Sequence, residues 1–308
     1  MHPPLARTVR KLVPASLIAL ALLGCRPKIP AIAAPERVAA SPSPPATMSL
    51  CWIESGRFGP ATASALLIRH GAETVLVDAG NSSNFDAEIE VYDAPIRRRF
   101  ARLPGLLKPD RPFSEQLRAI GVEPETITWF IPTHAHIDHI GGYLDLPPLP
   151  VLMAAPEQDL IERGRDQVLE EVVPAHARAI AAQIQPIAFD DGPYETFPTH
   201  ADLFGDGSLI LLPLHGHTPG SVGVLVNLPD GRRIFLIGDA ANDRKGVAKL
   251  RARPKLLRWT DADRPKAEGV VAQLHALVEA APEIELVPAH ERKAYVETFG
   301  APAERCPP

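Results

Sequence analysis

Four side chains that can bind a metal fall within six positions of the sequence. They are His134, His136, Asp138 and His139, and they lie in the segment THAHIDHIGG, directly after an apolar run. Neutral imidazoles and carboxylates are suitable ligands for zinc and related divalent cations. A strand that ends in a turn lets such closely spaced side chains converge on one point, which a straight strand or helix would not allow. The segment therefore predicts a metal site.

Three further candidate ligands follow apolar runs later in the chain. His217 lies in LHGHTPG, Asp239 ends IFLIGD and His290 ends LVPAH. Because ligand sites gather at the strand ends of α/β sheets, we expect these three side chains to join the first four. We interpret His215 as a residue that supports a ligand or lies at the surface. Four other histidines are interpreted as structural or solvent-exposed: His70, His176, His200 and His275.

The elements that must position these side chains alternate between strand and helix patterns. Strands are predicted at 65–69 and 74–78 (a hairpin), 126–132, 209–214, 221–226, 233–237 and 284–287. Helices are predicted at 115–120 with Ser114 as the N-cap, within 156–185 with breaks at Gly164 and Pro174, and at 265–280. Neither GxGxxG nor GxxxxGK[ST] occurs, so nucleotide binding has no local support. Residues 81–113 are expected to be irregular, with Arg97–Arg99 as a solvated face; a lid over a pocket is the alternative.

The N-terminus is interpreted as a targeting segment, residues 1–25. Basic residues precede an apolar stretch that is too short to span a bilayer and that ends in LLGC. This ending resembles a bacterial lipoprotein signal and implies export to the periplasm or outer membrane, with a lipid anchor at Cys25. A plain secretory signal and an uncleaved anchor are the alternatives. Residues 26–48, rich in Pro, Ala and Ser, are expected to form a linker before a domain at 49–308.

The bulk composition limits the classes of partner. The formal net charge is −5, and no basic stripe interleaved with aromatic residues occurs, so we expect no nucleic-acid partner and a membrane contact only through the anchor. Hydrophobic residues make up 45% of the chain, enough for a buried core. If Cys25 carries lipid, Cys51 and Cys306 remain as a pair that an oxidising compartment would allow to form a disulfide. Two isolated thiols are the alternative.

The succession HxHxDH, GHTPG, GD and a late strand ending in His resembles the metallo-β-lactamase superfamily over about residues 50–300. The resemblance implies an α/β fold, a four-layer αβ/βα sandwich of two mixed β-sheets. It also implies two divalent metal ions, with zinc expected first and iron or manganese as alternatives. His134, His136 and His217 would hold one ion. Asp138, His139 and His290 would hold the other, with Asp239 between them. A bridging hydroxide would attack the substrate, and Asp138 would also assist with proton transfer.

Asp239 and the residues after it narrow the substrate class that the resemblance implies. True zinc β-lactamases generally lack this bridging aspartate, and glyoxalase II-like thioesterases continue with a GCGR-like segment that is not present here. Lactonases share all seven ligands, but many have tyrosine where this chain has Asn242, which could still donate a hydrogen bond to an oxyanion. We therefore expect hydrolysis of an ester-type bond in a small molecule, with a lactone favoured. A β-lactamase, a thioesterase and a metal-binding lipoprotein without turnover are the alternatives.

Overall fold

The computed structural model of the chain describes residues 26–38, 41–101, 104–165 and 172–307. The predicted signal peptide, 1–25, and the candidate anchor Cys25 lie outside these ranges. Across the described ranges, no helix combines the length and the apolar character needed to cross a membrane.

The described strands form two mixed sheets. The first has the order β1-β2-β3-β4-β5-β6, antiparallel up to β3 and parallel from there on; its strands are β1 (Ser49–Phe58), β2 (Ala61–His70), β3 (Glu73–Val77), β4 (Trp129–Ile131), β5 (Val151–Ala154) and β6 (Ile184–Ile187). The second has the order β11-β10-β9-β8-β7, and only β10 and β11 are parallel; its strands are β7 (Ala201–Asp202), β8 (Leu209–Pro213), β9 (Val222–Asn227), β10 (Arg233–Leu236) and β11 (Ile284–Val287).

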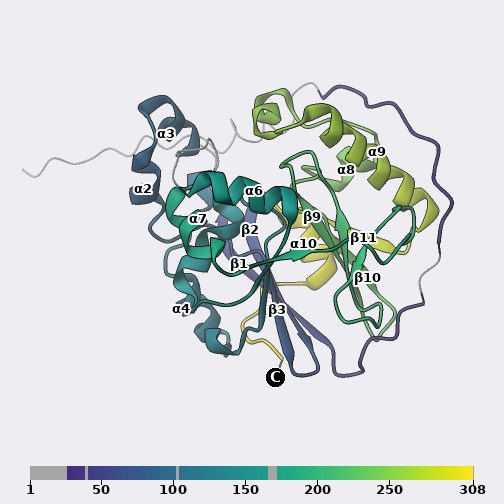
Figure 1. The fold of residues 1–308 in the computed structure, drawn as a ribbon, viewed down its shortest axis with the longest axis horizontal. Coiled ribbons are helices and arrows are strands. Elements are labelled where there is room, and N and C mark those ends of the chain that lie inside the picture. The colour runs from purple at the N-terminus through teal and green to yellow at the C-terminus, as the bar shows by residue number, and fades with distance from the viewer. Residues whose placement is uncertain (1–25, 39–40, 102–103, 166–171, 308) are drawn as a thin grey trace, which may run out of the picture.

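Helices cover the outer faces of the two sheets, which pack against each other in the centre of the molecule (Figure 1). Successive side chains of β2 point to opposite faces of the first sheet. Leu66 and Ile68 pack between the two sheets, whereas Leu67 packs against the helices on the outer face. The outer helices are α4 (Phe113–Ala119), α6 (Ala155–Gly164) and α7 (Pro174–Ala181) on the first sheet, and α8 (Arg244–Ala248) and α9 (Arg264–Ala280) on the second. This arrangement confirms the predicted four-layer αβ/βα sandwich, and α10 (Arg292–Phe299) closes one of its edges.

The start of α4 differs from the prediction. The helix begins at Phe113, one residue before the expected cap Ser114, and no cap side chain next to the helix accepts a hydrogen bond. Instead, the Asp145 carboxylate accepts a hydrogen bond from the Phe113 N–H at 2.7 Å. Ser114 as N-cap is therefore wrong, because a carboxylate 32 residues away in sequence satisfies the end of the helix.

The stretch 81–113, expected to be irregular, contains several short helical turns. They are α2 (Phe85–Glu88), η1 (Ile89–Val91), α3 (Ala94–Phe100) and η2 (Pro104–Leu107). Phe85, Tyr92 and Phe100 form a small buried cluster with Ile137, which lies between two of the candidate ligands in sequence. The described part of this stretch therefore supports the segment that carries His136 and Asp138 from one side.

Residues 26–38 do not form the free linker expected for 26–48. Arg26 pairs with Asp243 at 2.5 Å, and the Ile29 N–H donates to the Leu250 carbonyl at 2.7 Å. The Ile29 side chain is 3% exposed and packs into the core beneath α8 and α9. Arg37 pairs with the buried Glu195 at 2.5 Å. The purple segment in Figure 1 accordingly follows the side of the molecule that carries α9.

The disulfide that the cysteine positions allowed is present. Cys51 on β1 is joined to Cys306 near the C-terminus, with the two Cα atoms 5.4 Å apart. The bond ties the edge strand of the first sheet to the end of the chain.

Candidate metal centre

The structure brings all seven predicted ligands together at one edge of the sandwich. They come from the loops that follow four buried strands, β4, β8, β10 and β11, and from the short helix α5 (Ile137–Ile140) behind β4. The seven residues form three overlapping groups of three, and within each group the ligand atoms lie within 4.8 Å of one another. The groups are His134–His136–His217, His134–His139–Asp239 and Asp138–His139–His290.

The first group consists of three buried imidazoles. His134 Nε2 and His217 Nε2 each lie 3.0 Å from His136 Nδ1. In a tetrahedral zinc site with Zn–N bonds near 2.1 Å, neighbouring nitrogens are about 3.4 Å apart, so these slightly shorter separations suit one shared ion after a small adjustment. Burial lowers the pKa of each of the three histidines, and neighbouring imidazoles lower it further for His134 and His136. The lone pairs of the neutral rings are therefore available to a cation.

The second group contains His139, His290 and Asp138, and Asp239 lies between it and the first group. His290 Nε2 is 3.5 Å from Asp138 Oδ2 and 3.2 Å from Asp239 Oδ1. His139 Nε2 is 3.9 Å from each of the two carboxylates. The other oxygen of Asp239, Oδ2, is 3.4 Å from His217 Nε2 in the first group. Asp239 thus presents one oxygen to each group.

The ring nitrogens that face away from the centre have partners of their own. His139 Nδ1 lies 2.9 Å from Asp78 Oδ2, His217 Nδ1 lies 3.0 Å from Asp261 Oδ1, and His290 Nδ1 lies 2.8 Å from the Thr62 carbonyl oxygen. Such partners fix the orientation of a metal-binding histidine and leave its other nitrogen free for the metal. Burial alone would lower the pKa of His139, but the negative charge of Asp78 and its hydrogen bond, together with Asp138 and Asp239, raise it to about 10.

Glu157 holds two of the ligand-bearing loops against each other. Its buried carboxylate accepts hydrogen bonds from the Ala135 N–H at 2.6 Å and from the Gly220 N–H at 2.8 Å. Ala135 lies between His134 and His136, and Gly220 lies three residues after His217. Burial raises the pKa of Glu157, whereas these hydrogen bonds and one to Thr218 oppose that shift. One side chain at the start of α6 therefore fixes the spacing of the first group.

Gly238, directly before Asp239, is required for close packing. Its φ is +50°, and a Cβ at this position would lie 2.8 Å from the Thr133 side chain. A larger residue would push Asp239 away from the loop that carries the other ligands.

The donor set fits two divalent cations. Among the described residues, His139 Nε2 is buried and has no hydrogen-bond partner, although it points at two carboxylates. A buried nitrogen without a partner is costly unless a ligand such as a cation satisfies it. The side chains of His290, Asp138 and Asp239 are 23%, 13% and 12% exposed, whereas those of His139 and His217 are 2% and 1% exposed. The centre therefore opens to solvent at its second group.

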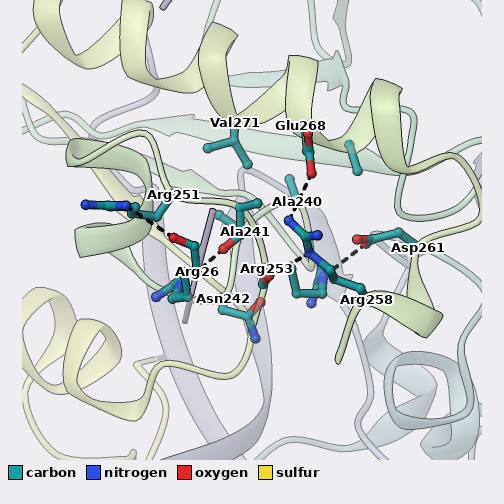
Figure 2. Close-up of a pocket in the computed structure, with 12 residues that line it drawn as sticks. Arg26, Ala240, Ala241, Asn242, Arg251, Arg253, Arg258, Asp261, Glu268 and Val271 are labelled. Carbon is teal, nitrogen blue, oxygen red and sulfur yellow. Dashed lines mark hydrogen bonds and ion pairs between the residues drawn. The ribbon is translucent and has the colours of Figure 1, made fainter. Parts of the chain in front are cut away.

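Asn242 and His215 lie near the centre but outside the three ligand groups. Asn242 lines a narrow gap beside Arg253 and Asp261 (Figure 2), and its Oδ1 has no hydrogen-bond partner within the described part of the chain. His215 faces Phe189, with ring centroids 6.4 Å apart, and burial lowers its pKa. The other histidines have different partners: His70 contacts Asp206, His176 contacts Glu88, His200 contacts the Gly192 carbonyl and His275 contacts the Val247 carbonyl.

Four residues that support the ligands were not found from the sequence. Asp78 could have been recognised, because it ends an apolar strand in the same way as Asp239 does. Glu157, Arg253 and Asp261 have no such signal, since each is a single charged residue in an ordinary helix or loop sequence.

A family model described as the metallo-beta-lactamase superfamily matches residues 58–290, about three quarters of the chain. The chain belongs to the metallo-β-lactamase superfamily. The part of the chain that the family model matches begins in β1 and ends at the last of the seven candidate ligands. It therefore contains all seven of them.

Curated relatives of this superfamily member are N-acyl homoserine lactonases. One from Agrobacterium fabrum (strain C58) is 26% identical over 184 residues, which cover 57% of this chain and 63% of the relative. Another, from a Bacillus species, is 26% identical over 139 residues, or 45% of this chain and 48% of the relative. The chain thus spans less than two thirds of the length of either relative.

Solved structures of the same class share the fold. A quorum-quenching N-acyl homoserine lactone lactonase has a TM-score of 0.58 and 17% identity, with 84% of this chain and 97% of that chain covered. An N-acyl homoserine lactone hydrolase with N-hexanoyl-L-homoserine bound at its catalytic metal centre also has a TM-score of 0.58, with 18% identity and coverage of 80% and 95%. These similarities confirm the architecture.

Proposed function

We propose that this protein is a binuclear metal-dependent hydrolase of an ester-type bond, with a lactone as the substrate class. The observation that carries the proposal is the position of Asp239, whose two oxygens face the two groups of ligands separately. An arrangement of this kind suits two cations that share one carboxylate. The curated relatives, which are N-acyl homoserine lactonases, support a lactone in preference to the other substrate classes of the superfamily.

In this proposal His134, His136 and His217 hold one ion, Asp138, His139 and His290 hold the other, and Asp239 contacts both. Two divalent ions, zinc first and iron or manganese as alternatives, would polarise a substrate carbonyl and lower the pKa of a water towards neutrality. The buried partners Asp78 and Asp261 keep His139 and His217 in the orientation that binding requires.

Two side chains of this protein are proposed to act on the substrate. Asp138 lies on the more exposed side, 3.5 Å from His290, where a carboxylate can also accept and return a proton. Asn242, three residues after Asp239, occupies the position at which many lactonases have a tyrosine. Its amide N–H groups are proposed to donate to the oxyanion that develops when the ester carbonyl is attacked.

We also propose that the protein is exported through residues 1–25 and is anchored by lipid at Cys25. The disulfide between Cys51 and Cys306 supports export, because disulfides persist in oxidising compartments. Mass spectrometry of the protein from membrane fractions tests the anchor. A diacylglyceryl group on Cys25 is expected, and an unmodified N-terminus further along the chain would contradict it.

The proposed activity is tested by metal analysis together with a panel of substrates. We expect the purified full-length protein to contain about two zinc or iron ions per chain by inductively coupled plasma mass spectrometry. The same protein is assayed with a lactone, a thioester, a phosphodiester and a β-lactam, and the lactone is expected to be hydrolysed fastest. Preferred turnover of nitrocefin or of a thioester would replace the lactone by one of the alternative classes. Bound metal without turnover of any of the four would favour a binding protein, and an absence of bound metal would overturn the proposal.

A further inference from the structure

Arg253 is a buried cation that contacts two of the seven candidate ligands. It lies between α8 and the turn η5 (Lys255–Thr260), and its side chain is 8% exposed. Burying a guanidinium group is costly unless carboxylates and other acceptors surround it. The acceptors that surround Arg253 belong to Asp261 and Asp239, so this cation is placed at the metal centre rather than in a remote ion pair.

Arg253 is connected to His217 through the carboxylate of Asp261. Asp261 Oδ1 accepts a hydrogen bond from Arg253 Nε at 3.0 Å and lies 3.0 Å from His217 Nδ1. Because His217 Nε2 faces the other ligands, its proton belongs on Nδ1, and Asp261 accepts that bond too. Arg253 Nε is then a second donor to the same carboxylate oxygen, and Arg253 Nη2 lies 3.2 Å from the protonated Nδ1 without a hydrogen bond between these two donors. The dashed lines in Figure 2 include the contact between Arg253 and Asp261.

Arg253 also contacts Asp239 directly. Arg253 Nη2 donates a hydrogen bond to the backbone carbonyl of Asp239, and Nη1 lies 3.8 Å from its Oδ2. Oδ2 is the same oxygen that faces His217 at 3.4 Å. A single guanidinium therefore connects the histidine of the first group to the carboxylate that lies between the two groups.

The segment around Arg253 is held at both ends, so the guanidinium has a defined position. The Ala252 N–H donates to the Pro27 carbonyl at 2.9 Å, and Arg258 Nε donates to the Arg253 carbonyl at 3.2 Å. Farther along the segment, the Ala262 N–H donates to the carbonyl of His217 itself at 2.9 Å. The planar fork of an arginine in such a frame can set the separation of the groups it bridges, which the single ammonium of a lysine cannot do.

We propose that Arg253 is a positioning residue that, together with Asp261, fixes His217 and Asp239 relative to each other, and so sets the geometry with which they bind metal. The inference rests on the metal centre of the proposed function. It assigns to this arginine a role in metal binding that goes beyond an ion pair that only stabilises the fold. Without the guanidinium, Asp261 and Asp239 lose the cation that they share. Asp261, which orients the His217 ring, is then no longer held in place by Arg253.

The test compares three variants of the full-length protein. Arg253→Met keeps the aliphatic stem but removes every donor, and Arg253→Lys keeps the charge but not the fork. Arg251→Met is the matched control, because Arg251 lies in the same segment, is exposed and donates to the Arg26 carbonyl at 3.2 Å (Figure 2). Zinc affinity is measured by competition with a chromogenic chelator, and the absorption spectrum of the cobalt-substituted protein reports the geometry of the ligands.

Both Arg253 variants are expected to bind the weaker-held zinc about 10- to 100-fold less tightly and to change the cobalt spectrum. The zinc-free Arg253→Lys variant keeps the positive charge, so its thermal midpoint is expected to stay close to that of Arg251→Met, which itself keeps wild-type affinity and spectrum. Arg253→Met leaves the buried Asp261 without its cation and is expected to unfold at a lower temperature. Wild-type affinity in Arg253→Met or in Arg253→Lys would overturn the inference, as would an equal loss in Arg251→Met. A wild-type protein that binds no zinc at all would overturn the metal centre itself, which separates the two failures.

Discussion

At the scale of single residues, the centre depends on which atom of each ligand is already engaged by the protein. His139, His217 and His290 all use Nδ1 for a partner outside the centre, and the three partners differ: a carboxylate, a carboxylate shared with an arginine, and a backbone carbonyl. Each partner leaves Nε2 directed inwards. The charge differs as well, because Asp78 and Asp261 each bring a negative charge next to the centre, whereas the Thr62 carbonyl does not.

Asp239→Ala tests the carboxylate between the two groups. We expect metal content to fall from about two ions towards one per chain, because both groups lose the oxygen that faces them. Hydrolysis is expected to fall by about 100-fold or more. Asp230→Ala is the control, since Asp230 pairs with Arg232 in the exposed turn between β9 and β10. Two tightly bound metals with full activity in Asp239→Ala would rule out the bridging role.

Asp78→Asn tests the charge behind His139. The amide keeps the shape of the side chain but removes the negative charge and can present an N–H to His139 Nδ1, so metal affinity is expected to fall by about 10- to 100-fold. Asp206→Asn is a matched control, because Asp206 contacts His70 at 2.7 Å in another part of the molecule. Chelator competition measures both variants. Equal affinity in the two would show that Asp78 contributes only to folding.

At the scale of elements, short segments around the centre are held by buried polar contacts. Glu157 at the start of α6 joins the loops that follow β4 and β8. Glu88 at the end of α2 accepts a hydrogen bond from Ser82 at 2.7 Å and contacts His176 of α7 at 2.8 Å. Residues 82–100 are therefore fixed to α7 and to α5, which begins at Ile137, and this favours a constant wall of the site over a moving lid.

The Glu88 contact predicts a dependence of stability on pH. Burial alone would raise the pKa of Glu88, but the hydrogen bonds and charge of His176 and the hydrogen bond of Ser82 lower it below its ordinary value of 4.5. The Glu88 carboxyl of the unfolded chain then binds a proton more readily than that of the folded protein. The ionised carboxylate therefore adds to the free energy of unfolding in full above pH 4.5, and this stabilisation is lost as the pH falls through the lowered pKa of the folded state.

Glu88→Gln is expected to remove this contribution. The variant should unfold more easily than the wild type at pH 7, and the difference should shrink as the pH falls below 4.5. Urea unfolding between pH 3 and pH 7 measures the effect, and Glu90→Gln, in the exposed part of η1, is the control. A constant difference across this range would show that the charge of Glu88 is not responsible.

At the scale of the whole molecule, both ends of the described chain are fixed to the sandwich. The disulfide joins Cys306 to β1, and residues 26–38 run along the second sheet and its helices. Glu195 shows how residues 26–38 are held. Its fully buried carboxylate pairs with Arg37 at 2.5 Å and with Arg233 at 2.7 Å. Removing one partner of a buried ion pair leaves an uncompensated charge, so this segment contributes to the stability of the domain.

A protein that begins at residue 49 is expected to be less stable than one that begins at residue 26. The shorter protein loses the buried Ile29 side chain, worth about 1.5–3 kcal/mol, as well as the ion pairs of Arg26 and Arg37. For a domain of this size, a loss of about 2–3 kcal/mol lowers the thermal midpoint by at least about 4 °C. Differential scanning fluorimetry measures it, and Arg37→Met in the longer protein should give a smaller decrease. Equal midpoints would return 26–48 to the role of a free linker.

Local patterns in the sequence determined most of the fold and all seven candidate ligands. Short apolar, β-rich runs predicted β2, β3, β4, β8, β9, β10 and β11, and the types and spacing of the residues around His134 to His139 predicted a metal site. Such features are local, because a strand's periodicity and a cluster of ligands within six positions are visible without knowledge of the rest of the chain.

Only the tertiary structure decided which residues support those ligands. Asp78, Asp261 and Glu157 lie 61, 44 and 22 residues from the groups they hold, and Asp145 caps a helix 32 residues away. In the sequence Asp261, Glu157 and Asp145 are isolated charged residues, which are most often solvated. Asp78 ends an apolar strand, but no local pattern shows that it contacts His139. Arg26, Arg37 and Arg253, which no sequence pattern singled out, make structural contacts for the same reason. A buried charge acquires its role from the partners that folding brings within about 3 Å, and no local pattern records that distance.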